Sequence, residues 1–308
     1  MKKLILGIIL LLAGVAATLY LSPATLIASV QFAERSLAGL SSRQLQVGDL
    51  NIHYYEGGKA DRPTIVMIHG FGANRDNWLR FARFFTTDYH VIALDLPGFG
   101  ESSKPDASYD VGTQADRLQE FLHTLGLEKV HLIGNSMGGH IAALYAARHP
   151  QEVLTLALLD NAGVTSPRKS EMFERVERGE ANPLVVRKAE DFQALMEFVF
   201  VDPPPLPDAL KRYFAEQSMA NSEHYDRIFD QLIHQYIPLE PELSKIQAPT
   251  LLLWGDQDRV LDVSSIEVMQ PLLRDPTVVI MKDCGHAPMI ERAEETANHY
   301  RAFLDSQH

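Results

Sequence analysis

The stretch HLIGNSMGGHIAALYAARHP, from His131 to Pro150, passes from an apolar run into a helix-like segment through a serine flanked by glycines. Gly134 and Gly138 stand two residues to either side of Ser136, in the pattern G-x-S-x-G. Glycines at these positions let a strand-to-helix turn close without Cβ clashes, which presents the serine hydroxyl at the carboxyl end of the strand. Because the pentapeptide also arises by chance, Ser136 is a credible nucleophile only if the chain also supplies a base, an acid and an oxyanion site.

Around this stretch, short β-like runs alternate with helix-like segments from residue 42 onward. The β-like runs are the hairpin RQLQVGDLNIHYYEGG (43–58), TIVMIHG (64–70), HVIALDLPGFG (90–100), EVLTLALLD (152–160), PTLLLWGDQD (249–258) and TVVIMKDCGH (277–286). Strands that alternate with helices indicate a mostly parallel sheet covered by helices on both faces. Residues 161–248 interrupt the alternation and are too many for an ordinary loop. We therefore expect a core of residues 42–160 and 249–308 with a helical cap at 161–248.

A serine hydroxyl needs a base to take its proton, because an alcohol is a poor nucleophile at neutral pH. Among the twelve histidines, His286 stands directly after the last predicted strand, where an imidazole can reach the serine turn. Asp258, after the penultimate strand, is the expected acid that orients this imidazole. Asp256 in the same loop and Asp160 at the end of the preceding strand are the alternatives. The chain order Ser, Asp, His suits this architecture with any of the three.

The negative charge that develops on an attacked carbonyl needs backbone N–H donors. Met137, the residue after the serine, is expected to supply one of them. The loop HGFGAN after the run 64–70 is expected to supply the other, from Phe71. We interpret His69 in that loop as a brace for the loop, and His140 as a structural residue.

The bulk properties of the chain exclude several classes of function. Its 308 residues carry a formal net charge of −12, which argues against nucleic acid as a partner. A single cysteine, Cys284, leaves no intrachain disulfide and no cysteine-based zinc site. Gly98-Phe99-Gly100 lacks the third glycine of a dinucleotide fingerprint. We expect neither a metal nor an organic cofactor.

The N-terminus predicts a membrane anchor at residues 1–21. After Lys2 and Lys3, the eighteen residues from Leu4 to Leu21 carry no charge, and as a helix they span about 27 Å of a hydrocarbon core of about 30 Å. A cleaved signal peptide, with SPA (22–24) near the cut, is the alternative. Lysines before a span stay on the cytoplasmic side. The catalytic domain of a single-pass protein then lies outside, which is the periplasm if the membrane is a bacterial inner membrane.

Two further features of the N-terminal region indicate contacts with a second copy of the chain and with either the lipid surface or the soluble domain. Ala13 and Ala17 form a small-xxx-small pattern, which predicts a homodimer through paired anchors. Residues 22–41 read as an amphipathic juxtamembrane helix. Its apolar face would consist of Leu26, Ile27, Val30, Ala33 and Leu37. This face suits either the lipid surface or the soluble domain, and the pattern does not decide between them.

With these residues in place, the chain resembles the α/β-hydrolases, and most closely the membrane-anchored monoacylglycerol lipases and a bacterial inner-membrane phospholipase A. The resemblance covers nearly all residues from 42 onward. Its motifs are HGFGANRDNW (69–78), DLPGFGESSKP (95–105), GNSMGGHIAALYAARHP (134–150), LLLWGDQDRVLDVSS (251–265) and CGHAPMIERAEETA (284–297). It implies Ser136 as nucleophile, Asp258 as acid, His286 as base, Phe71 and Met137 as oxyanion donors, and a cap that sets acyl and head-group preference.

The sequence therefore predicts a serine ester hydrolase that releases fatty acids from membrane-derived lipids through an acyl-enzyme, as a phospholipase A, lysophospholipase or monoacylglycerol lipase. Two alternatives stay open. C–C bond hydrolases of ring-fission products also carry GNSMGG, but they typically have tryptophan after the catalytic histidine, where this chain has Ala287. The other alternative is a non-catalytic, membrane-tethered scaffold with the same fold.

Overall fold

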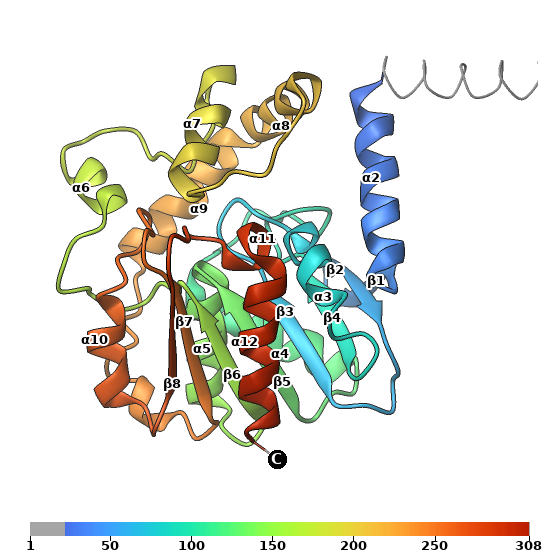
Figure 1. Ribbon diagram of the computed structural model, residues 1–308, viewed down its shortest axis with the longest axis vertical. Coiled ribbons are helices and arrows are strands. Elements are labelled where there is room, and N and C mark those ends of the chain that lie inside the picture. Colours follow the sequence, from blue (N-terminus) through green and yellow to red (C-terminus); the bar gives the residue numbers. More distant parts are fainter. Residues whose placement is uncertain (1–21, 308) are drawn as a thin grey trace, which may run out of the picture.

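The computed structural model describes residues 22–307, which are organised around one eight-stranded sheet in the order β1-β2-β4-β3-β5-β6-β7-β8 (Figure 1). The strands β1 and β2 form an antiparallel hairpin, β2 pairs antiparallel with β4, and all the other pairs are parallel. The mostly parallel sheet predicted from the sequence is therefore confirmed. The strands are β1 (Leu40–Val47), β2 (Leu50–Gly57), β3 (Thr64–Ile68), β4 (His90–Leu94), β5 (Val130–Asn135), β6 (Val153–Leu159), β7 (Thr250–Gly255) and β8 (Thr277–Met281).

Helices cover both faces of the sheet. One face is packed by α3 (Leu79–Ala82), α11 (Pro288–Glu291) and α12 (Ala293–Asp305), and α12 crosses in front of the sheet in Figure 1. The opposite face is packed by α4 (Val111–Thr124), α5 (Met137–Arg148) and α10 (Ser265–Met269). Three short 3-10 turns are η1 (Arg75–Trp78), η2 (Leu243–Lys245) and η3 (Gln270–Leu272).

The central strands are continuous apolar runs because each strand contributes to two cores. In β3, Ile65 and Met67 pack on the α3 and α12 side, whereas Val66 and Ile68 pack on the α4 and α5 side. All four side chains are fully buried. Successive side chains of a strand point to opposite faces, so a strand with helices on both sides has no solvent-facing position for a polar residue.

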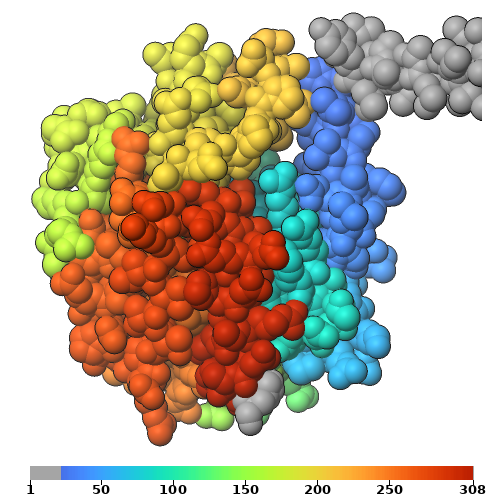
Figure 2. All heavy atoms as spheres, viewed as in Figure 1, coloured from blue at the N-terminus to red at the C-terminus, as the bar shows by residue number. Residues whose placement is uncertain are grey.

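The interruption between β6 and β7 contains four helices: α6 (Glu171–Glu177), α7 (Ala189–Val199), α8 (Asp208–Ala220) and α9 (Ser222–His234). Figure 2 shows this segment lying across one end of the core. The segment contacts loops that follow the carboxyl ends of strands. The C=O of Val199 accepts from the N–H of His286 after β8, and His224 in α9 bonds the C=O of Gly98 after β4. We refer to residues 161–248 as the cap.

The first described helix, α2, runs from Pro23 to Leu37 and is shorter than the predicted 22–41. The hydroxyl of Ser22 caps its start by accepting from the N–H of Thr25. Gly39 ends it with a φ of +65°, a conformation that costs glycine little. Because the chain turns there, Leu40 and Ser41 belong to β1 instead.

The apolar face predicted for α2, which suited either the lipid surface or the soluble domain, is mostly not packed against the described part of the soluble domain. Among its five predicted members only Ile27 is buried, while Val30 and Leu37 are 44% and 72% exposed. The helix contacts the core through its polar side, where Gln31 donates to Asp76 at 2.6 Å and Arg80 donates to Glu34 at 3.2 Å. Apolar spacing does not reveal that the surface beneath the helix offers charged partners.

The predicted anchor at residues 1–21, together with its small-xxx-small pattern, lies outside the described residues. Between residues 22 and 307, no helix combines the length and the apolar character needed to cross a membrane.

We predict that Gly134→Ala lowers the free energy of unfolding by about 3 kcal/mol or more, or prevents folding. A Cβ at Gly134 would lie 2.4 Å from the backbone oxygen of Gly138, and neither backbone segment has room to retreat. Urea unfolding followed by circular dichroism measures the effect.

The matched control is Gly126→Ala, at a position with a φ of +72° and no atom within 4 Å of the added methyl group. The expected loss in the free energy of unfolding comes only from backbone strain there and is about 1–2 kcal/mol. Equal losses in the two variants would contradict the close-packing argument.

Candidate active site

Ser136 stands on the sharp turn between β5 and α5. Its φ of +57° and ψ of −122° lie outside the regions that side-chain-bearing residues ordinarily occupy. The conformation is held on both sides, because the N–H of Ser136 donates to Leu159 at 3.0 Å while its C=O accepts from Ala162 at 3.1 Å. A strained backbone conformation of this kind persists only where several surrounding interactions hold it in place, and such conformations are concentrated at functional sites. The strand–turn–helix context expected for the serine is present.

His286 and Asp258 form a buried hydrogen-bonded pair. The Nδ1 atom of His286 lies 2.8 Å from Oδ2 of Asp258. The other carboxylate oxygen, Oδ1, accepts from the N–H groups of Val260 at 2.7 Å and Leu261 at 3.1 Å. With the carboxylate held by two backbone donors, the ring is fixed with a proton on Nδ1, which leaves Nε2 as an acceptor.

Asp256, the alternative candidate for the acid that orients His286, has a different hydrogen-bond partner. Its side chain accepts from the N–H of Asp283 at 2.8 Å and joins the loops that follow β7 and β8. Among the described residues it makes no contact with His286. The structure thus brings Asp258, and not Asp256, to the imidazole.

Asn135 ties the serine turn to the histidine loop, and sequence reasoning missed it. Its Nδ2 donates to the C=O of Leu159 at 3.1 Å and to the C=O of His286 at 2.9 Å. One buried amide therefore holds the end of β5, the end of β6 and the loop after β8 together. The available signal was a polar residue at the end of an otherwise apolar strand, next to the serine.

The loop after β3 lies against the serine. A Cβ added to Gly70, the residue before Phe71, would be 3.0 Å from the Cβ of Ser136. His69 braces this loop, as interpreted from the sequence. Its Nδ1 bonds the C=O of Gly70 at 2.8 Å, and its Nε2 accepts from the N–H of Leu96 at 3.0 Å. Burial lowers the pKa of this imidazole to about 4.

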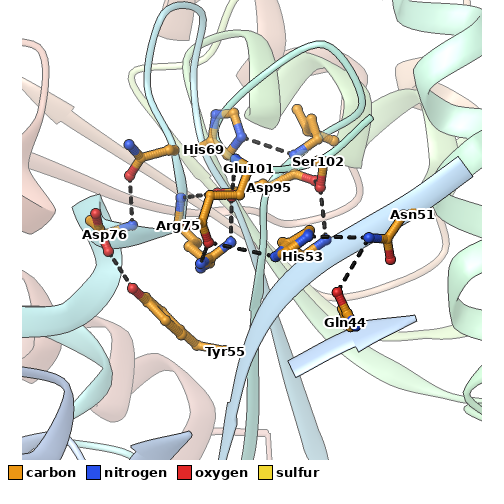
Figure 3. Close-up of polar contacts among 12 residues, drawn as sticks. Gln44, Asn51, His53, Tyr55, His69, Arg75, Asp76, Asp95, Glu101 and Ser102 are labelled. Atoms are coloured by element: carbon orange, nitrogen blue, oxygen red, sulfur yellow. Dashed lines mark hydrogen bonds and ion pairs between the residues drawn. The ribbon is translucent and has the colours of Figure 1, made fainter. Parts of the chain in front are cut away.

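A second brace for the same loop is the charged network in Figure 3, which the sequence analysis did not identify. The carboxylate of Asp95 accepts from the backbone N–H of Arg75 at 2.7 Å and from its guanidinium at 2.5 Å. The guanidinium also bonds Glu101. Asp76 accepts from the hydroxyl of Tyr55 at 2.5 Å and from Gln31 of α2. The network joins the loops that follow β3 and β4 and attaches α2 to them.

The ring of Phe71 connects this loop to the cap. It packs edge-on against Phe99 at a centroid distance of 6.1 Å, and against Tyr225 and Phe229 of α9 at 5.8 Å and 5.7 Å. Edge-on aromatic pairs contribute stability beyond that from the burial of their apolar surface. A change in the position of α9 would therefore act on the loop beside Ser136.

Three side chains meet closely enough to be compared with a metal site. Ligand atoms of Asp160, Asp258 and His286 all lie within 4.8 Å of one another. Most of these atoms already have partners, since Oδ1 of each aspartate accepts a backbone N–H and Nδ1 of His286 faces Asp258. The arrangement is that of an acid–base pair with a second carboxyl group beside it.

Comparisons with known proteins agree with this geometry. Residues 63–293 match the family model described as alpha/beta hydrolase fold. The chain is 38% identical to Lipase 1 of Psychrobacter immobilis over 275 residues, which cover 88% of this chain and 86% of the lipase. It is 31% identical to the monoacylglycerol lipase ABHD6 of Mus musculus, with 95% and 90% covered. A crystal structure described as a membrane phospholipase A, a novel bacterial virulence factor, superposes with a TM-score of 0.92 at 66% identity and covers 100% and 99%.

We predict that the imidazoles of His69 and His140 stay neutral down to about pH 4, because burial lowers the pKa of each to about that value. Between the unfolded value of 6.5 and pH 4, the unfolded chain binds protons that the folded chain does not, so these two groups lower stability as the pH falls. An NMR titration of the ring carbons checks this, with the urea-unfolded chain as control and His69→Gln to assign one signal. Protonation of both rings near pH 6 would contradict it.

Proposed function

The chain belongs to the alpha/beta hydrolase family and is a carboxylic ester hydrolase of lipid esters, and we propose that it releases fatty acids from membrane phospholipids with Ser136, His286 and Asp258 as catalytic triad. The main support for this triad is the buried His286–Asp258 pair, in which Nδ1 and Oδ2 are 2.8 Å apart. A hydrogen bond from Asn135 to the C=O of His286 links this pair to the turn that bears Ser136. The order and the separate loops of these three residues match the requirements of acyl transfer.

The chemistry follows from the fixed tautomer of His286. Its Nε2 takes the proton of Ser136 as the hydroxyl attacks the ester carbonyl, and Asp258 stabilises the imidazolium that forms. His286 then protonates the leaving alcohol, and the fatty acid stays bound to Ser136 as an acyl-enzyme. A water molecule that gives its proton to His286 hydrolyses this ester and restores the serine.

The oxyanion that forms in each step is assigned to the N–H groups of Phe71 and Met137. In support, neither group donates a hydrogen bond to any of the described residues, Met137 directly follows Ser136, and Phe71 directly follows Gly70, whose backbone approaches Ser136 closely. Met137 is the first residue of α5, so its N–H is one of the orphan donors at the positive end of a helix. Removal of one such donor typically slows acyl transfer about 100-fold or more.

Phospholipids are the proposed first substrate because the structural relative at 66% identity is named a membrane phospholipase A. Monoacylglycerols and lysophospholipids are the next candidates, since the curated relatives include monoacylglycerol lipases at about 30% identity over nearly their whole length. All three substrates present the same ester carbonyl to Ser136. The cap, through the contact of α9 with Phe71, is the proposed determinant of head group and acyl length.

We further propose that the protein is held at a membrane by residues 1–21, with its catalytic domain on the periplasmic side of a bacterial inner membrane. Support comes from the named membrane relative and from α2, the helix that follows the proposed anchor in the chain, whose apolar side chains Val30, Phe32 and Leu37 are exposed. Pairing of two anchors through Ala13 and Ala17 stays a prediction.

We predict that detergent-solubilised protein releases fatty acid from phospholipid vesicles, and that Ser136→Ala lowers the rate by at least about 10⁴-fold. Mass spectrometry of a mixture of phospholipids, lysophospholipids, monoacylglycerols and short-chain esters identifies the preferred class. Ser42→Ala, an exposed serine on β1, serves as the matched control and retains full activity.

Release confined to monoacylglycerols or short esters would reject the phospholipid assignment while keeping the triad. Equal release by the wild type and Ser136→Ala would reject the triad itself.

A further inference from the structure

Asp160 is a fully buried carboxyl group that the proposed mechanism does not use. It follows β6 in a left-handed conformation with a φ of +45°. Its backbone N–H donates to Leu253 at 3.0 Å, and its Oδ1 accepts from the N–H of Gly255 at 2.9 Å. The backbone strain and the buried acid both oppose folding, so the group needs an explanation beyond packing.

Asp160 lies close to both the proposed catalytic acid and the imidazole. Atoms of its carboxyl group, of the Asp258 carboxyl group and of the His286 ring lie within 4.8 Å of one another. The two oxygens of Asp258 are engaged, one by two backbone N–H groups and one by His286. In contrast, Oδ2 of Asp160 is buried and receives no hydrogen bond from any residue in the described part of the chain.

Two buried carboxyl groups this close cannot both be ionised at neutral pH, because the charges repel in a medium of low dielectric. Asp258 has three donors to stabilise a negative charge, whereas Asp160 has one. The proton therefore belongs on Asp160. Consistent with this placement, burial raises the pKa of Asp160 well above its ordinary value, and the charges of Asp258 and Glu291 raise it further.

We propose that Asp160 is a positioning residue whose protonated Oδ2 donates a hydrogen bond to the carboxylate of Asp258 and thereby fixes the catalytic acid against His286. The inference rests on the proposed triad. Asp160 keeps its proton throughout turnover, so no proton passes through it. Its contribution is geometric, because it supplies a further donor to the carboxylate that orients the imidazole.

The proton on Asp160 also limits the negative charge behind His286 to that of Asp258. The titratable groups that face Asp160 are the carboxyl groups of Asp258 and Glu291, the thiol of Cys284 and the imidazole of His286. A second ionised carboxylate within 4.8 Å of the ring would stabilise the imidazolium form and shift the acid limb of the pH–rate profile upward.

Two variants test whether position 160 needs a neutral hydrogen-bond donor or the carboxyl group itself. Asp160→Asn keeps a neutral hydrogen-bond donor of the same shape, and asparagine tolerates the left-handed conformation. Asp160→Gly removes the donor without adding backbone strain. With p-nitrophenyl butyrate at pH 7.5, we expect kcat of the Asn variant within about threefold of the wild type. We expect kcat of the Gly variant to fall by about 10- to 100-fold with little change in KM.

The pH profile distinguishes positioning from a merely structural role. The acid limb of kcat/KM should coincide in the wild type and in Asp160→Asn, because one neutral group replaces another. A downward shift of this limb in the Asn variant would show that Asp160 is ionised in the wild type and would overturn the proposal. Full activity of Asp258→Asn combined with loss in Asp160→Asn would also overturn it, by making Asp160 the catalytic acid.

An infrared measurement tests the proton without relying on activity. At pH 8 the wild type should show the carbonyl stretch of a protonated carboxylic acid, well separated from the carboxylate bands, and Asp160→Asn should lack it. Absence of the band in the folded wild type would overturn the proposal. Because the band is independent of turnover, it decides the state of Asp160 even if Ser136→Ala were to show that the proposed triad is wrong.

Discussion

The turn at Ser136 is the constraint on which the rest of the site depends. A residue with a φ of +57° is stable there only because the strand before it and the helix after it meet almost without side chains. Gly138 brings α5 so near to β3 that a Cβ would lie 2.3 Å from the C=O of Ile68. This close approach of helix and strand places the loop after β3 directly beside the serine.

Three loops from distant parts of the chain converge on this turn, and buried polar groups hold them there. Asn135 fixes the histidine loop, His69 and Arg75 fix the loop that bears Phe71, and Val199 at the end of α7 accepts from the N–H of His286. A buried polar group is stable only when it is paired. Any displacement of one loop therefore leaves unpaired groups in another, so the site and its cap behave as one unit.

The sequence predicted the parts of this protein that local rules determine. Apolar runs bounded by turns predicted the strands, and the glycines around Ser136 predicted the turn, because steric exclusion acts over a few residues. The contact between Asp258 and His286 was predicted from their places after β7 and β8, since adjacent parallel strands end at one edge of the sheet.

What could not be predicted depends on partners far away in the chain. The burial of the polar side of α2 follows from Asp76, 45 residues beyond Gln31, and apolar spacing carries no information about it. The structural roles of Asn135, Arg75 and Asp160 likewise depend on atoms that surround them in space and come from distant parts of the chain. A polar residue at the end of a buried strand marks a position worth attention, but its partner becomes visible only in the fold.

Ser136 is proposed to be an activated nucleophile held by this turn, and covalent labelling tests this role most directly. Folded protein is treated at pH 7.5 with a fluorophosphonate, and the intact mass and the modified peptide are measured. We expect one adduct per chain, on Ser136, and slow or absent labelling in His286→Ala. Labelling at another serine, or none in a folded protein, would contradict it.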